Sequence, residues 1–256
     1  MSARPAALVT GGADRIGAAF VQALAEDGFD VALHFRSSRE AAERTAEAAR
    51  RHGGRVELVH ADLAEPAERG ELLAASAEAL GRAPVALVNN ASMFAFDDLA
   101  GLDEPLWRAH LEANLTAPVF LIRDFARALQ GSEGVVVNLL DQKVNRPNPD
   151  FFSYTASRMG LAGMTAPLAL ALAPNIRVAG IAPGLTLPSQ VHPDSDFEAA
   201  QASAPLRRGP TPDDLVSALR FILRTPSFTG QIVTVDAGES LIGRPRDVAF
   251  DQGRYD

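Results

Sequence analysis

Residues 153–160, SYTASRMG, place a phenol and a permanent cation one helical turn apart. Side chains four positions apart lie on one face of a helix, so Tyr154 and Arg158 can act at the same point. A free phenol has a pKa near 10, and a cation about 4–5 Å away, at an effective dielectric constant near 20, favours its anion by roughly 4 kcal/mol. The pair is therefore a candidate for proton transfer near neutral pH, with surface decoration as the alternative.

A carboxylate also belongs to this candidate site. Asp141 follows a strand-like run in NLLDQK, upstream of Tyr154. An ionised Asp141 beside Tyr154 would raise the pKa of the phenol and oppose Arg158. A protonated Asp141, or one that accepts a hydrogen bond, would instead orient Tyr154. The sequence leaves the charge of Asp141 open.

The elements that must position these side chains are short apolar runs that alternate with helical segments. Strands are predicted over residues 6–10, 30–35, 55–60, 85–89, 134–140, 176–181 and 231–236. Helices are predicted over residues 16–27, 39–52, 66–80, 104–130, 154–173 and 212–224, with a bend at Pro167. Continuous apolar strands alternating with helices indicate a parallel sheet covered on both faces. The predicted fold class is α/β, a single-domain Rossmann-type doubly wound parallel sheet of about seven strands with helices on both faces.

A glycine-rich turn, TGGADRIG, follows the first predicted strand. Gly11, Gly12 and Gly17 would let the backbone approach a diphosphate at the start of a helix. Free N–H groups and the helix dipole favour anions there. The turn therefore predicts a dinucleotide site, with a turn used only for packing as the alternative.

The end of the second strand indicates which dinucleotide is bound. It reads HFRSS, with no acidic residue to bind a ribose 2′-hydroxyl. Arg15, Arg36 and Ser37 could together clamp a 2′-phosphate, because guanidinium groups pair with phosphate through two hydrogen bonds. The cofactor expected is NADP(H) rather than NAD(H).

The composition excludes several other classes of protein. The 256 residues include no cysteine, which excludes disulfides, thiolate metal sites and cysteine nucleophiles. The histidines show no HxxxH or HExxH spacing, so no metal site is expected. A net charge of −8 argues against nucleic acid and anionic membranes as partners. No long apolar run and no signal peptide is apparent, so a cytoplasmic location is expected.

Several segments together resemble the short-chain dehydrogenase/reductase superfamily. They are TGGADRIG at 10–17, ADL at 61–63, LVNNAS at 87–92, EANL at 112–115, YTASR at 154–158, IAPGLT at 181–186 and TGQIVTVDAGES at 229–240. The resemblance implies that Tyr154 is the proton donor and that Asn114 holds a water of the proton relay. Asp62 would lie near the adenine. With the glycine turn and the phosphate clamp, the expected cofactor-binding residues are Gly11, Arg15, Ile16, Gly17, His34, Arg36, Ser37, Asp62, Leu63, Asn89, Ala91, Ser92, Arg158, Pro183, Gly184 and Thr186.

Two positions depart from the family pattern. The family usually has serine where this chain has Asp141, and lysine where it has Arg158. Arginine can supply the charge and bind ribose hydroxyls, but it essentially never releases its proton, so we expect a working but slowed relay. Lys143 would share a side of the strand with Asp141, and our hypothesis is that it partly replaces the missing lysine.

The first departure resembles one branch of the superfamily, the pteridine and dihydromonapterin reductases. Asp141, an arginine in the glycine turn and Ser-x-Phe after NNA carry this resemblance. In that branch an aromatic residue after NNAS stacks on the pterin ring, which Phe94 matches, and Ser92 matches a serine that contacts substrate and cofactor. The expected catalytic residues are Asp141, Tyr154, Arg158 and Asn114. The expected substrate-binding residues are Ser92, Phe94, Asp141 and Tyr154.

The predicted function is an NADPH-dependent reductase of a C=N or C=O bond, with a pteridine such as a dihydropterin as the favoured substrate. A reductase of 3-oxoacyl or other carbonyl compounds is one alternative. A sensor that binds NADP(H) with little or no turnover, because of Arg158, is the other.

Residues 1–256 are expected to form one dinucleotide-binding and catalytic domain. Residues 187–204 are its expected substrate lid, and residues 243–256 form a polar tail that is disordered or reaches a neighbouring subunit. The family usually forms dimers or tetramers through the helices near residues 104–130 and 154–173, so a homodimer or homotetramer is expected.

Overall fold

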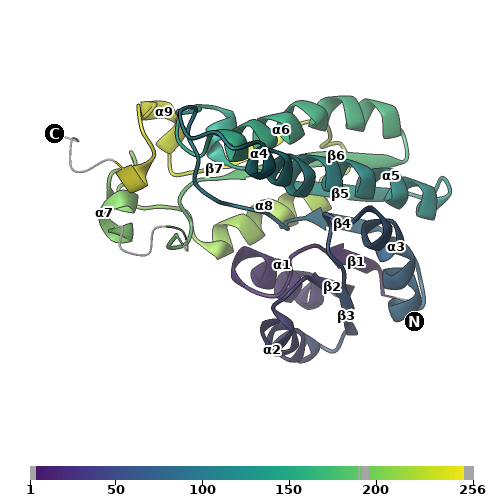
Figure 1. The fold of residues 1–256 in the computed structure, drawn as a ribbon. Coiled ribbons are helices and arrows are strands. Elements are labelled where there is room, and N and C mark those ends of the chain that lie inside the picture. Colours follow the sequence, from purple (N-terminus) through teal and green to yellow (C-terminus); the bar gives the residue numbers. More distant parts are fainter. Residues whose placement is uncertain (1–3, 190, 192–195, 251–256) are drawn as a thin grey trace.

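A single parallel sheet forms the centre of the molecule in the computed structural model, which describes residues 4–189, 191 and 196–250. The strands in these residues follow the order β3-β2-β1-β4-β5-β6-β7 (Figure 1). Every neighbouring pair is parallel. The strands are β1 (Ala6–Val9), β2 (Asp30–Phe35), β3 (Val56–His60), β4 (Ala86–Asn89), β5 (Gly134–Leu139), β6 (Ile176–Pro183) and β7 (Ile232–Val235). The predicted doubly wound α/β fold is confirmed.

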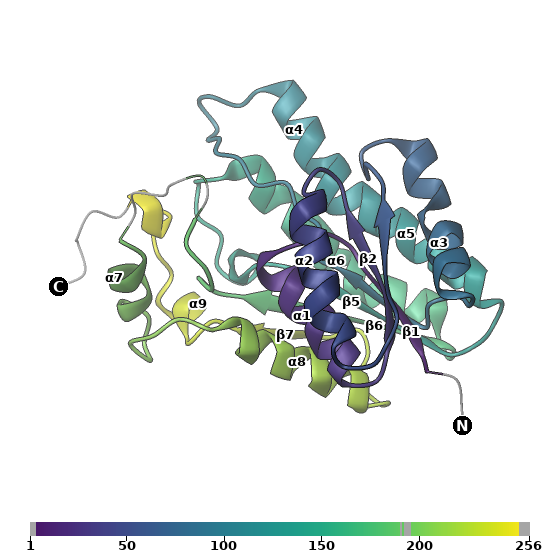
Figure 2. The ribbon, with the colours of Figure 1, turned by 90° about the horizontal axis from the view of Figure 1, so that it is seen from below.

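Helices cover both faces of the sheet (Figures 1 and 2). Those in the described residues are α1 (Arg15–Glu26), α2 (Arg39–Arg50), α3 (Pro66–Leu80), α4 (Glu104–Leu111), α5 (Ala117–Leu129), α6 (Phe152–Leu172), α7 (Phe197–Ala202), α8 (Pro212–Arg224) and α9 (Glu239–Ile242). Phe20 on α1 and Leu219 on α8 are fully buried in the core on one face. Phe125 on α5 is fully buried in the core on the other. Burial on both faces explains why the strands are continuous apolar runs.

Most predicted elements begin and end within about two residues of the observed ones. The helix predicted over residues 104–130 is the exception, because α4 and α5 are separated by a π-helical turn at Glu112–Thr116. Such turns occur frequently at functional sites, and this one contains Asn114. α6 continues through Pro167. The short helices α7 and α9 were not predicted.

The chain order places the candidate site at one edge of the sheet. β1 and β4 are neighbours, and the connections that follow them lead to opposite sides of the sheet order, to β2 and to β5. Open parallel sheets bind ligands outside the carboxyl ends of their strands at such a switch point. The glycine turn follows β1 and the NNAS segment follows β4, so both lie at this crevice.

Two features, a membrane-spanning helix and a cluster of metal ligands, are not found in the described part of the chain. None of its helices is long and apolar enough to cross a membrane. Nor do three or more His, Asp or Glu side chains of the described residues gather as they would to hold a metal ion.

Candidate active site

The turn after β1 has two positions that only glycine fits. Gly11 has φ +61°, and a Cβ there would lie 2.9 Å from the Cα of Ala91. A Cβ at Gly17 would lie 2.1 Å from the carbonyl oxygen of Gly11. Both contacts are with backbone, so no rotation of a side chain relieves them. Since α1 begins inside this turn, its first N–H groups face the crevice. Together, the glycine turn and the start of α1 form a cradle that fits the diphosphate of a dinucleotide.

Three polar side chains hold the turn from behind. The Oγ1 of Thr10 accepts hydrogen bonds from the N–H groups of Asn90 and Ala91, each at 3.0 Å. The amide of Asn90 donates to the carbonyls of Thr10 and Gly11 at 2.9 and 2.8 Å. Nδ1 of His34 accepts from the Gly11 N–H at 3.0 Å, and Nε2 lies 3.0 Å from the Ala61 carbonyl. Burial lowers the pKa of His34 to about 4, so the ring is neutral and can accept this bond.

His34 therefore supports the glycine turn with both ring nitrogens engaged, and its expected direct contact with cofactor stays a prediction. Thr10 and Asn90 were missed as site residues. Thr10 belongs to the motif TGG and Asn90 to the motif NNAS, so the sequence contained a signal for both residues.

The residues expected to bind the adenosine end are only partly brought together. Arg36 lies at the tip of β2, 4.0 Å from the carboxylate of Asp62, and both can be reached by solvent. Ser37 is exposed beside Arg36. Arg15 has φ +52° and donates from its guanidinium to the carbonyl of Pro188 at 3.0 Å. It thus links the glycine turn to the start of the predicted lid, of which residues 190 and 192–195 lie outside the described residues.

The two remaining expected residues near this end have apolar surroundings. Ile16, in the first turn of α1, packs against the core on one face, and Leu63 is buried in the core on the opposite face. Their expected contact with cofactor stays a prediction.

Tyr154 and Asp141 are joined by a direct hydrogen bond. The Tyr154 hydroxyl donates to Oδ2 of Asp141 at 2.9 Å, and Oδ1 of Asp141 accepts from the backbone N–H of Lys143 at 2.9 Å. Burial raises the pKa of Asp141, although the charges of Lys143 and Arg158 act in the opposite direction. The carboxyl group thus serves as the hydrogen-bond acceptor that orients Tyr154.

The expectation that Arg158 lowers the pKa of Tyr154 below its ordinary value is wrong. Burial, followed by the Asp141 charge, raises the pKa of the phenol, and the Arg158 guanidinium only partly offsets them. The phenol therefore keeps its proton at neutral pH. Composition and spacing could indicate the opposing charges, but not the depth of burial that decides between them.

Arg158 lies beneath the phenol ring and is 2% exposed. Its guanidinium carbon is 5.4 Å from the Tyr154 ring centroid, and one of its N–H groups donates to the Leu139 carbonyl at 2.9 Å. Its Nε has no hydrogen-bond partner among the described residues. An unsatisfied buried donor costs about 1–3 kcal/mol, which a hydroxyl acceptor would offset. This fits the expected contact with a ribose, which stays a prediction.

Lys143 does not face Arg158 or the phenol. Its ammonium lies 2.7 Å from Oδ2 of Asp247 and donates to the carbonyl of Asp150 at 3.2 Å. Asp150 lies in the loop after β5 and Asp247 in the C-terminal segment, and the ammonium also lies 4.8 Å from the centroid of the Phe151 ring. The hypothesis that Lys143 partly replaces the missing lysine stays a prediction.

Asn114 fixes the backbone of the predicted substrate-binding segment. Its Oδ1 accepts from the Met93 N–H at 2.8 Å, and its Nδ2 donates to the Met93 carbonyl at 2.9 Å and to Oγ of Ser157 at 3.1 Å. The side-chain amide is therefore engaged by protein groups. Its predicted role in holding a water stays a prediction, as does substrate contact by Ser92, whose hydroxyl donates to the Met93 carbonyl at 3.2 Å.

Aromatic rings surround the Tyr154 phenol. The ring of Phe94 stacks on Phe151, with centroids 4.3 Å apart, and meets Tyr154 edge to face at 4.7 Å. Phe94 is 39% exposed, so part of it remains available to a ligand. Phe151 has φ +54° immediately before α6 and was not predicted as a site residue. Phe96 meets Phe151 edge to face at 5.4 Å and extends the cluster.

A buried polar network fixes the start of α6, and with it Tyr154. The carboxylate of Asp97 accepts from the Ser153 N–H at 3.1 Å. The Ser153 hydroxyl lies 2.6 Å from Nδ1 of His110, whose Nε2 accepts from the Ala95 N–H at 3.2 Å. The network therefore joins α6 to the segment that carries Phe94. No pattern in the sequence pointed to these residues.

The loop after β6 closes the crevice. A Cβ at Gly184 would lie 2.8 Å from the Cα of Asp236, so β6 and β7 approach closely there. Thr186 donates to the Gly184 carbonyl at 2.9 Å. The carboxylate of Glu239 accepts from the Leu185 N–H at 3.2 Å, and burial raises the pKa of Glu239 to about 7. Glu239 was not expected at the site. β6 extends to Pro183, two residues beyond the predicted end of the strand, and contact of Pro183 with the cofactor stays a prediction.

The buried amides of Asn89 and Asn138 join the ends of β4 and β5 beside this crevice. Nδ2 of Asn89 donates to Oδ1 of Asn138 at 2.9 Å. Their remaining Oδ1 and Nδ2 atoms have no hydrogen-bond partner among the described residues. The expected place of Asn89 in the lining of the cofactor cleft stays a prediction.

The fold and the site define a dinucleotide-binding α/β protein with a buried tyrosine at its crevice. The family model described as short chain dehydrogenase matches residues 5–198, and the chain belongs to this family. A solved structure of FolM alternative dihydrofolate reductase 1 from Brucella suis, in complex with NADP, is 41% identical with a TM-score of 0.89, covering 94% of this chain and 97% of that one.

Curated relatives show the same family with different names. Pteridine reductase 1 of Leishmania tarentolae is 31% identical, covering 93% of this chain and 96% of the relative. A putative ketoacyl reductase 2 of granaticin polyketide synthase from Streptomyces violaceoruber is 33% identical, covering 93% of this chain and 97% of the relative.

Proposed function

We propose that this protein is an NADPH-dependent short-chain reductase that reduces a C=N or C=O bond of a pteridine such as a dihydropterin. The observation that carries the substrate class is the group formed by Phe94, Tyr154 and Asp141. It offers an exposed aromatic ring beside a phenol that is hydrogen-bonded to a carboxyl group. A flat, amino-substituted heterocycle needs a stacking partner and a hydrogen-bond acceptor of this kind.

The cofactor proposal rests on the glycine cradle and the charges around it. Gly11 and Gly17 leave room for the diphosphate, and Arg36 is an exposed cation directly after β2, which supports its expected role in binding a 2′-phosphate. Arg158 has a donor to offer a ribose hydroxyl. When bound, the reduced nicotinamide supplies a hydride. The similar FolM structures were solved with NADP, which supports the same choice here.

In the proposed reaction, the chain supplies the proton and stabilises the charge left behind. Tyr154 is protonated at neutral pH and donates its proton to the substrate. The Arg158 guanidinium then stabilises the phenolate, because it lies against the ring and does not release its own proton. Asp141 fixes the direction of the phenol O–H through its hydrogen bond.

A reductase of 3-oxoacyl compounds is the second candidate. The ketoacyl reductase and 3-oxoacyl-[acyl-carrier-protein] reductase names among the relatives favour it. Asp141 and Phe94 favour the pteridine, because an acyl chain requires neither a carboxyl partner nor a stacking ring. The buried Tyr154–Asp141 pair argues against an NADP(H) sensor without turnover, because binding of the cofactor alone does not require such a pair.

NADPH oxidation measured with dihydrobiopterin, and separately with a diketone, tests the proposal. We expect turnover with the pterin, and Tyr154→Phe should lower kcat by about 100-fold or more because the proton donor is lost. NADPH binding, followed by cofactor fluorescence, should persist in the variant. Tyr255→Phe makes the same change at the chain's other tyrosine and serves as the control.

Turnover with the diketone only would contradict the proposed pteridine substrate and favour a carbonyl substrate. NADPH binding without turnover on either compound would favour the sensor.

The oligomeric state belongs to this proposal as well. Phe120 on α5 and Met159, Met164 and Leu170 on α6 are large apolar side chains that are partly or largely exposed. These are the helices through which a homodimer or homotetramer was expected, and exposed apolar side chains are typical of such interfaces. A homo-oligomer stays a prediction.

A further inference from the structure

The C-terminal segment, residues 244–250, packs onto the candidate site of its own chain. From the sequence, residues 243–256 were expected to form a polar tail that is disordered or reaches a neighbouring subunit. The segment instead lies against the loop after β5 and ends in a short 3-10 helix at Val248–Phe250. Residues 251–256 lie outside the described residues.

The first anchor of this segment is a forked ion pair. The Arg246 guanidinium donates to both carboxylate oxygens of Asp150, at 2.7 Å and 2.8 Å. The Asp247 N–H donates to the same carboxylate at 2.7 Å. Asp150 is 1% exposed, and although burial acts in the opposite direction, these donors hold the pKa of Asp150 below its ordinary value. The Arg246 side chain is 51% exposed, but a bidentate pair with a buried carboxylate fixes position as well as contributing energy.

The second anchor leads to the reacting groups. The carboxylate of Asp247 lies 2.7 Å from the ammonium of Lys143, whose side chain is 5% exposed. The backbone N–H of Lys143 donates to Asp141, which in turn accepts from the Tyr154 hydroxyl. Only one residue, Lys143, therefore separates Asp247 from the Asp141–Tyr154 pair.

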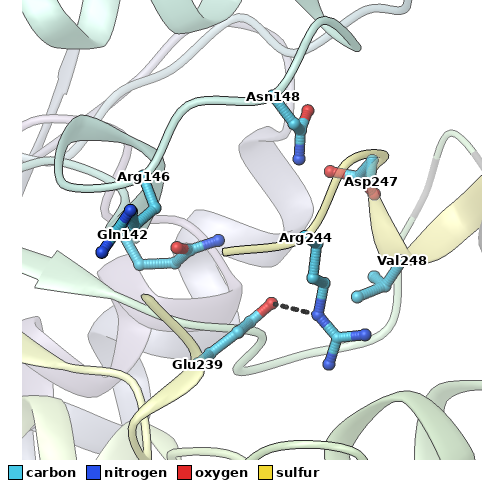
Figure 3. A pocket seen from close by; sticks show the side chains of 7 residues that line it. All are labelled: Gln142, Arg146, Asn148, Glu239, Arg244, Asp247 and Val248. Atoms are coloured by element: carbon cyan, nitrogen blue, oxygen red, sulfur yellow. Dashed lines mark ion pairs between the residues drawn. The ribbon is translucent and has the colours of Figure 1, made fainter. Parts of the chain in front are cut away.

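The third contact is aromatic. Phe250 lies 4.9 Å from Phe96 and 6.2 Å from Phe151, measured between ring centroids. Phe151 stacks on Phe94, so Phe250 extends the cluster that surrounds Tyr154. Figure 3 shows the small pocket left between the loop residues Gln142, Arg146 and Asn148 and the segment residues Arg244, Asp247 and Val248.

We propose that residues 246–250 form a latch on the catalytic centre, in which Asp247 is a positioning residue that sets the charge of Asp141 through Lys143. The carboxylate of Asp247 neutralises the buried ammonium of Lys143, which also lies 4.8 Å from the centroid of the Phe151 ring. Arg246 and Phe250 keep Asp247 in place. The inference rests on the proposed function of Asp141 and Tyr154.

The sign of the effect follows from the groups around Asp141. Lys143 lies on its own loop, Tyr154 and Arg158 approach from α6, and Glu239 acts from α9. Removing the charge of Asp247 leaves the Lys143 cation uncompensated, which favours the Asp141 anion and lowers the pKa of Asp141. Removing the charge of Lys143 leaves Asp247 uncompensated and has the opposite effect. Asp247 also raises the pKa of Glu239, so loss of its charge lowers that pKa too.

The test is a ¹³C NMR titration of the Asp141 carboxyl group in the full chain, assigned with Asp141→Asn. We expect Asp247→Asn to lower the pKa of Asp141 by at least about half a unit, and Lys143→Gln to raise it by a similar amount. Asp247→Glu should restore the wild-type value. Asp213→Asn makes the same change at an exposed position on α8 and is the control. The pH profile of kcat should move in the same direction as the NMR value, with little change in NADPH binding.

Opposite shifts from the two sides of one ion pair would not arise from general loss of structure. The latch is overturned if Asp247→Asn and Asp213→Asn give the same pKa for Asp141. It is overturned as well if a lower melting temperature is the only effect of Asp247→Asn. It is also overturned if both pair variants shift the pKa in one direction. Should the wild type fail to turn over any substrate, the proposed function fails, while the NMR titration still decides the latch.

Discussion

The Tyr154 hydroxyl and the partly buried Asp141 carboxylate share one hydrogen bond, and Tyr154 and Arg158 are themselves buried. In such surroundings each charge acts strongly, and burial disfavours every anion. Asp141 favours the protonated phenol, whereas Arg158 favours the phenolate. The cation is therefore needed most after the proton has left, because it is then the nearest opposite charge.

At the scale of single residues, substitutions of Arg158 separate the effect of its charge from the effect of its shape. Arg158→Met should lower kcat/KM by about 100-fold or more, because the phenolate loses its counter-charge in a buried site. Arg158→Lys keeps the charge and adds a group that can release and regain a proton, so kcat should equal or exceed that of the wild type. Steady-state kinetics with NADPH and the best substrate checks both values.

An inactive Arg158→Lys variant would show that the site needs the guanidinium itself, for example its bond to the Leu139 carbonyl. An Arg158→Met variant with normal turnover would remove Arg158 from the reaction altogether.

At the scale of elements, the glycine turn and the NNAS segment form one rigid unit. Thr10, Asn90 and His34 tie the end of β1 to β2 and β4 through hydrogen bonds that leave little freedom. The close approach of Gly17 to the Gly11 carbonyl belongs to the same unit. We therefore expect the cofactor cradle to be present before the cofactor arrives.

Gly17→Ala tests this rigidity, because its new Cβ would meet the Gly11 carbonyl and force the backbone to move. NADPH affinity should fall by about 100-fold or more, equivalent to roughly 3 kcal/mol or more, as measured by fluorescence titration. Gly70→Ala is the matched control, since a Cβ there meets nothing within 4 Å inside α3. That control should bind NADPH normally and be stabilised by about 0.5–1 kcal/mol. Equal NADPH affinity in the two variants would contradict a preformed cradle.

The elements themselves could be predicted from the sequence, because burial on both faces leaves a local signature in β1 to β7. The turn glycines and Tyr154 were equally readable, since short motifs determine their conformation. Asp97, His110 and Phe151 were not, because their roles depend on contacts between residues far apart in the chain. The π-helical turn at Asn114 was hidden for the same reason, and so was the burial that raises the pKa of Tyr154.

On the scale of the whole molecule, the last part of the chain completes the site that the first part begins. β7 and α9 bring Glu239 under the loop after β6, and the following segment reaches the loop after β5. Residues from the middle and from the C-terminal part of the chain therefore determine the electrostatics around Asp141. A consequence is that global stability and the charge of the site depend on pH through the same buried carboxyl groups.

Glu239→Gln should make this dependence visible. The pKa of Glu239 is raised from 4.5 to about 7, so the folded state holds a proton more tightly than the unfolded state. The stability that this proton contributes is fully present below about pH 4.5 and is lost as the pH rises through about 7, a loss of up to roughly 3 kcal/mol. Glutamine cannot ionise, so the free energy of unfolding of the variant should lack this decrease. Between pH 5 and pH 8, the free energy of unfolding of the variant, measured by urea denaturation, should therefore rise relative to that of the wild type. Glu78→Gln, an exposed change on α3, is the control and should follow the wild type at both pH values. A constant difference between Glu239→Gln and the wild type would show that Glu239 is ionised in the folded protein throughout this range.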